Sequence, residues 1–180
     1  MRQYIGHLSI SDPLHGYLRD AILPQIAAPE REPRWRVFRV SSVSDVYLYE
    51  DKWTGCRVVG KFYARARGLN GSNAPQSAQH EYDGLAYLRS LGFDAPPDYV
   101  ARPLGVNAAL GDLLVTELAP GEQLDGVIED ALRAGRGERL YRKLGGLARF
   151  LARLHNRVAG PERVDFTPTQ GYFERVVSHL

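Results

Sequence analysis

Apolar and β-branched residues occur in short runs through the first two thirds of the chain, separated by polar stretches of turn-forming residues. Five segments have the composition of strands: residues 35–40, 46–49, 56–63, 100–106 and 113–117. The first three follow one another with only short turns, which predicts an antiparallel meander. The Asp51-Lys52-Trp53-Thr54-Gly55 stretch is typical of a hairpin turn.

Helical spacing of apolar residues is found elsewhere. It predicts helices over residues 77–91, 124–134, 140–158 and 172–180. A further helix is expected to begin at Ser11-Asp12-Pro13, a capping side chain followed by proline. Its apolar stripe would consist of Leu14, Leu18, Ala21 and Ile22. In the long helix, spacings of four and three give a one-sided stripe of Leu140, Leu144, Leu147, Leu151, Leu154 and Val158.

The order of these elements is three strands, a helix, two strands and then helices. This order predicts an α+β protein with a five-stranded antiparallel sheet. We expect an amino-terminal helical leader over residues 1–34, a sheet domain over 35–118 and a helical part over 119–180. The boundary is placed at Pro120-Gly121, where a cleft is expected.

Composition narrows the function classes. The 180 residues carry a net charge of only +2, which gives no indication of nucleic-acid binding. No apolar stretch approaches the length of a signal peptide or a membrane span. Cys56 is the single cysteine, so an internal disulfide is excluded and a reducing cytoplasm is the simplest location. The scattered histidines form no metalloenzyme pattern.

Two charged residues stand within otherwise apolar patterns. Lys61 lies in the third predicted strand and shares a face with Val59 and Tyr63. Glu81 lies one helical turn before Leu85, on the stripe of the following helix that must face the sheet. Because a carboxylate on a buried face is costly unless it is paired, Lys61 is its obvious partner. The alternatives are a lysine at a sheet edge and a glutamate at a solvated helix start.

Four segments in this order resemble the aminoglycoside-phosphotransferase family of small-molecule kinases. Val59-Gly60-Lys61 resembles the strand-three lysine motif, and Glu81 with its leucines resembles the glutamate helix. Residues 113–122 (LLVTELAPGE) resemble the last strand and hinge, and residues 144–155 resemble the long helix before the catalytic loop. The similarity spans residues 35–158 and implies a protein-kinase-like amino-terminal lobe followed by the first helices of the carboxy-terminal lobe.

The resemblance implies that the chain binds ATP. Lys61 would contact the α and β phosphates, and Glu81 would hold Lys61 in place. Adenine would lie at the hinge, against the Glu117 carbonyl and the Ala119 N–H. Val46 and Val59 would form an apolar roof over the base, and Thr116 would lie at the back of the pocket.

The turn at residues 41–45 occupies the place of the glycine-rich phosphate loop. It contains no glycine, which is a departure from kinases. The N–H groups and hydroxyls of Ser41, Ser42 and Ser44 are the candidate phosphate ligands there. A plain polar hairpin turn is the alternative.

The family's catalytic loop reads His-Gly-Asp, with magnesium ligands further on. None of the five histidines is followed two residues later by aspartate. Asp165-Phe166-Thr167 lacks the glycine of a metal motif and follows the long helix too closely. We therefore expect the amino-terminal part of an ATP-dependent phosphotransferase, whose Mg²⁺ ligands lie elsewhere and which transfers no phosphate by itself. The acceptor is expected to be a small-molecule hydroxyl compound.

The apolar stripe of residues 140–158 implies a further partner. In the related enzymes this helix is covered by the rest of the larger lobe, so we expect self-association through it. Two other readings stay open: a non-catalytic kinase-like module that binds nucleotide or protein, and an unrelated α+β binding domain with Lys61 and Glu81 on its surface. A eukaryotic-type protein kinase fits less well, because of the glycine-free turn and the Pro-Gly hinge.

Overall fold

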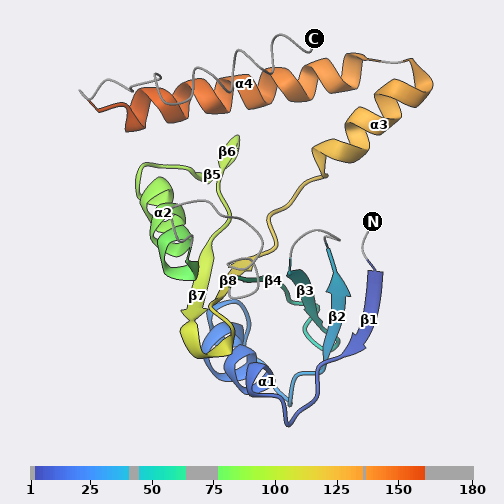
Figure 1. The fold of residues 1–180 in the computed structure, drawn as a ribbon, viewed down its shortest axis with the longest axis vertical. Coiled ribbons are helices and arrows are strands. Elements are labelled where there is room, and N and C mark those ends of the chain that lie inside the picture. Colours follow the sequence, from blue (N-terminus) through green and yellow to red (C-terminus); the bar gives the residue numbers. More distant parts are fainter. Residues whose placement is uncertain (1–2, 41–44, 64–76, 136, 161–180) are drawn as a thin grey trace. The chain divides into compact units, whose positions relative to one another are not determined.

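The computed structural model describes residues 3–40, 45–63, 77–135 and 137–160. The chain divides into two compact units, Met1–Gly121 and Glu122–Leu180, next to the Pro120-Gly121 position chosen from the sequence. We call them the sheet unit and the helical unit (Figure 1). Within the part of the chain that the structure describes, no helix is both long enough and apolar enough to cross a bilayer.

The sheet unit is built on a six-stranded antiparallel sheet with the order β1-β2-β3-β4-β8-β7. Its strands are β1 Gln3–His7, β2 Trp35–Arg39, β3 Val46–Asp51, β4 Arg57–Phe62, β7 Pro103–Asn107 and β8 Leu113–Glu117. The predicted meander of three consecutive strands is confirmed as β2, β3 and β4. The prediction of five strands was wrong, because β1 adds a sixth.

Strand β1 also corrects the expected helical leader over residues 1–34. It pairs with β2, with Gln3 opposite Arg39, so the start of the chain belongs to the sheet. Four of its five residues are exposed, and its register shifts between Tyr4 and Gly6. An exposed edge strand with a bulge needs no alternation of buried apolar residues, which explains why the hydrophobic pattern did not reveal it.

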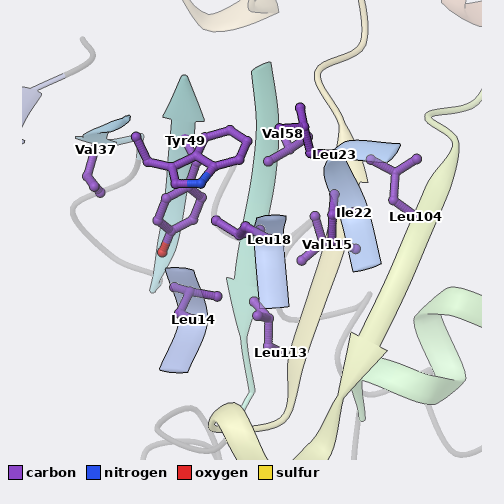
Figure 2. Close-up of a cluster of buried hydrophobic side chains, with 11 residues drawn as sticks. Leu14, Leu18, Ile22, Leu23, Val37, Tyr49, Val58, Leu104, Leu113 and Val115 are labelled. Carbon is purple, nitrogen blue, oxygen red and sulfur yellow. The ribbon is translucent and has the colours of Figure 1, made fainter. Parts of the chain in front are cut away.

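One face of the sheet is covered by the segment between β1 and β2. Helix α1 (Pro13–Tyr17) begins at Asp12, whose carboxylate accepts a hydrogen bond from the Leu14 N–H, as the sequence predicted. It continues into the π-helical turn η1 (Leu18–Ile22) and the 3₁₀ turn η2 (Leu23–Gln25). Figure 2 shows the buried side chains that these turns direct at the strands: Leu14, Leu18, Ile22 and Leu23 against Val37, Tyr49, Val58, Leu104, Leu113 and Val115.

The π-helical turn changes which residues are buried. The Leu23 N–H donates to the Leu18 carbonyl, a spacing of five rather than four residues. As a result Leu23 is fully buried, whereas Ala21 is exposed. The expected stripe was therefore correct for Leu14, Leu18 and Ile22 and wrong for Ala21.

Helix α2 (Ala78–Ser90) packs on the opposite face of the sheet, against β7 and β8. The Ser77 hydroxyl caps it by accepting a hydrogen bond from the His80 N–H. Its Ala78, Tyr82 and Leu85 lie against Tyr63, Leu114 and Val106. Two short strands that the sequence did not predict, β5 (Asp94–Ala95) and β6 (Asp98–Tyr99), and the 3₁₀ turn η4 (Ala108–Leu110) complete the unit.

The helical unit contains α3 (Leu124–Ala134) and α4 (Glu138–Val158), which contact each other. The bounds of α3 are those predicted, and it ends at Gly135, which has a left-handed backbone. Arg139 and Lys143 of α4 form ion pairs with Glu122, ahead of α3. No residue of α4 is buried. The predicted helix over 172–180 lies outside the described residues.

Candidate functional site

Lys61 lies near the end of β4, in the middle of the sheet. Its register partners are Val46 on β3 and Leu114 on β8. Side chains opposite each other in a sheet share a face, and Leu114 is among the residues covered by α2. Lys61 therefore projects from the face that carries α2, opposite the face covered by α1 and η1.

Glu81 lies in the first turn of α2, the helix that packs on this face of the sheet, and its carboxylate reaches the Lys61 ammonium. Its Oε2 atom is 2.5 Å from the Lys61 Nζ atom. The strand and the helix each fix one end of this contact, because β4 is paired on both sides and α2 is packed through Ala78, Tyr82 and Leu85. The predicted Lys61–Glu81 pair is present, and neither residue is an isolated surface charge.

Tyr63 joins the pair as a third member that the sequence analysis did not assign. Its hydroxyl donates to the same Glu81 Oε2 atom. The Lys61 Nζ atom also lies 4.7 Å from the centre of the Tyr63 ring, within the range of a cation–π contact. The available signal was the spacing of two along the strand, which places both side chains on one face.

The exposure of the pair indicates what it contributes. Both the Lys61 and the Glu81 side chains are 38% exposed. Ion pairs that reach solvent to this extent stabilise a fold by about 0–1 kcal/mol. The pair therefore contributes little to folding, and its effect is to hold a cationic donor at a fixed position that remains open to solvent.

The expected roof and back-wall residues lie on the same face as Lys61. Val59 is two residues before Lys61 on β4, and its register partners are Leu48 and Thr116. Val46 is the register partner of Lys61 itself. Val46, Val59 and Thr116 are all half-buried, so they form an apolar surface beside the ammonium that is only partly covered within the described residues.

Glu117 has a role for its side chain that the sequence analysis missed. Its carboxylate accepts hydrogen bonds from the Tyr99 hydroxyl and from the Arg102 N–H, the latter at 2.5 Å, and Arg89 of α2 lies 3.8 Å away. The hydrogen bond to Glu117 raises the pKa of Tyr99. This cluster connects α2, β6 and the end of β8, but nothing local in the sequence links Tyr99 to Glu117.

The remaining predicted residues contribute less. Ala119 is exposed and follows the end of β8. Ser41, Ser42 and Ser44 lie outside the described residues. Across residues 3–40, 45–63, 77–135 and 137–160, no cluster of three or more His, Cys, Asp or Glu side chains could hold a metal ion.

Comparison of the chain with protein-family models, with curated proteins and with solved structures finds no match in any of the three.

Proposed function

We propose that this chain is the nucleotide-binding portion of an ATP-dependent phosphotransferase that acts on a small-molecule hydroxyl. The observation that carries the proposal is the Lys61–Glu81 pair, with its Nζ–Oε2 distance of 2.5 Å, on the same sheet face as Val46, Val59 and Thr116. A lysine on a central strand paired with a glutamate on the next helix is the arrangement that kinases use to orient phosphates.

The residues present fit the nucleotide. Lys61 has three ammonium donors, so Glu81 can hold one while the others face an incoming phosphate oxygen. Its partial exposure leaves room for that approach. Val46 and Val59 offer an apolar surface for a base, and Thr116 borders it. The Glu117 and Ala119 backbone groups are the proposed hydrogen-bond partners of adenine.

The proposal assigns other parts of the reaction to residues that have not been located. A magnesium ion would supply positive charge that neutralises the phosphates. No cluster within the described ranges fits it, so no step is assigned to a metal held by them. The acceptor-activating aspartate of a His-x-Asp loop is absent from the 180 residues. We therefore expect these residues alone to bind nucleotide and to transfer no phosphate.

The test is binding of the non-hydrolysable ATP analogue AMP-PNP, measured by calorimetry with and without Mg²⁺. Lys61→Met removes the ammonium but keeps an unbranched side chain of similar length, and we expect affinity to fall about tenfold or more, the loss of one charged hydrogen bond. Lys52→Met is the matched control, since Lys52 is exposed in the β3–β4 turn and packs on Trp53. Equal affinities of the three proteins would contradict the proposal.

A second candidate is a non-catalytic kinase-like module that binds nucleotide or a partner protein. A natural full-length polypeptide that lacks both a His-x-Asp sequence and metal ligands would favour it. Phosphate transfer by the natural full-length polypeptide would support the enzyme. Tight AMP-PNP binding without any ATP turnover by that polypeptide would support the module.

A further inference from the structure

Tyr63 contacts both members of the charged pair from a fixed position. Its side chain is 3% exposed and packs with Ala78 of α2 and Leu114 of β8. Its hydroxyl and the Lys61 ammonium both donate to one oxygen of Glu81. Its ring lies beneath the ammonium, with 4.7 Å between the ring centre and Nζ.

The hydroxyl is the part of Tyr63 that packing does not explain. A phenylalanine would fill the same space between Ala78 and Leu114. A buried hydroxyl must find a hydrogen-bond partner, and here that partner is Glu81 rather than a backbone carbonyl. The rigid aromatic side chain thus fixes the carboxylate in a way that the flexible four-carbon stem of Lys61 cannot.

This difference matters when Lys61 gains a phosphate as a second partner. Two of its donors then turn towards the phosphate while the third stays on Glu81, and a carboxylate held only by that ammonium would shift or rotate with it. A second donor on the same oxygen keeps Glu81 in place. Glu81 then continues to hold Lys61 in the bound state.

We propose that Tyr63 is a positioning residue that orders the Lys61–Glu81 pair for phosphate binding. The proposal deepens the nucleotide-binding function proposed above and rests on it for the phosphate, whereas the ordering of Lys61 in the free protein does not depend on it. Tyr63 acts through Glu81 and need not touch the nucleotide.

The experiment compares Tyr63→Phe with wild type, with Tyr49→Phe as the matched control. Tyr49 is also 3% exposed, and it lies on the neighbouring strand β3 within the core on the opposite face of the sheet. Two quantities are measured in each protein: the order parameter of the Lys61 ammonium by ¹⁵N NMR without nucleotide, and the affinity for AMP-PNP by calorimetry. Thermal unfolding shows that each variant is folded.

For Tyr63→Phe we expect a clearly lower order parameter of the Lys61 ammonium and roughly three- to tenfold weaker AMP-PNP binding, as for the loss of one hydrogen bond. For Tyr49→Phe we expect neither change, even if its stability falls. An unchanged Lys61 order parameter in a folded Tyr63→Phe protein would overturn the positioning role. A lowered order parameter in a protein that binds no AMP-PNP in any form would support the positioning role and contradict nucleotide binding.

Discussion

Leu18, Ile22 and Trp35 of the sheet unit are completely buried, whereas Leu144, Leu147 and Leu151 of α4 are each about 40% exposed. Both units have regular secondary structure. Among the described residues only the sheet unit has a buried core on each face of a sheet, under α1 and η1 on one face and under α2 on the other. The sheet unit therefore contains its own stabilising interactions. The described part of the helical unit leaves an apolar stripe that needs a covering surface.

The largest expected effect comes from deleting a core side chain. Leu18→Ala should lower the free energy of unfolding of the sheet unit by about 2–5 kcal/mol, because Leu18 is fully buried and its removal leaves a cavity. Leu147→Ala, the matched change on α4, should lower it by less than about 1 kcal/mol. Denaturant unfolding is followed by tryptophan fluorescence for the sheet unit, which holds Trp35 and Trp53, the only tryptophans, and by far-ultraviolet circular dichroism for the helices of both units. Equal losses of unfolding free energy in the two variants would contradict the difference in burial between the two units.

The second largest effect on stability is expected at Asp51, a buried carboxylate of the sheet unit. The Asp51 carboxylate is 1% exposed and accepts hydrogen bonds from the Arg34 N–H and from the N–H and hydroxyl of Thr54. Burial alone would raise the pKa of Asp51, but these hydrogen bonds outweigh it and lower the pKa. Asp51→Asn should therefore lower the free energy of unfolding by about 1–3 kcal/mol at neutral pH.

The sign of the pH dependence follows from the lowered pKa. The stabilisation by Asp51 is present above its unfolded pKa of about 3.9 and is lost as the pH falls through the lower pKa of the folded state. The difference between wild type and Asp51→Asn, measured by urea unfolding, should therefore shrink below about pH 4. Glu122→Gln, at an exposed ion pair of the helical unit, should leave the unfolding midpoint nearly unchanged. A constant Asp51 difference down to pH 2 would count against this account.

The exposed stripe of α4 gives the third effect. We propose that residues 140–158 associate with a second copy of the chain. The double variant Leu144→Gln, Leu151→Gln should weaken this association about tenfold or more, because it removes apolar area from the contact. Leu132→Gln is the control, because Leu132 is more exposed still but lies on α3. Sedimentation velocity over a concentration series measures the association. A wild-type protein that stays monomeric at high concentration would refute it.

The smallest effect is expected at Lys61, within the sheet unit itself. Lys61→Met should change the free energy of unfolding by no more than about 1 kcal/mol. The ion pair that it removes contributes little, because the side chains of Lys61 and Glu81 are each 38% exposed. Thermal unfolding beside the binding measurement tests this. A large loss of stability would mean that the pair is part of the structural core rather than a positioned ligand.

The elements that the sequence predicted well are those whose pattern is set by burial on one face. Residues 113–117 and 124–134 are predicted to the residue, and Lys61 and Glu81 were paired correctly because each interrupts an apolar pattern. Strand β1 was missed because an exposed edge strand carries little pattern.

Other features depended on contacts that no local rule contains. In η1 the Leu23 N–H donates to the carbonyl five residues earlier, and this places Leu23 in the core. The hydrogen bond between Tyr99 and Glu117 joins residues 18 positions apart. Tyr63 could have been assigned from its spacing to Lys61, but only its burial against α2 shows why the hydroxyl meets Glu81.

Strand β1 has a practical consequence for anyone who trims or extends this protein. Deletion up to residue 34 would remove Leu14, Leu18, Ile22 and Leu23 and would uncover the outer row of amide and carbonyl groups on β2. A bare row of that kind recruits strands from other molecules and leads to aggregation. Fusion of a tag ahead of Met1 keeps β1 and its pairing with β2 in the chain and should be tolerated far better than that truncation.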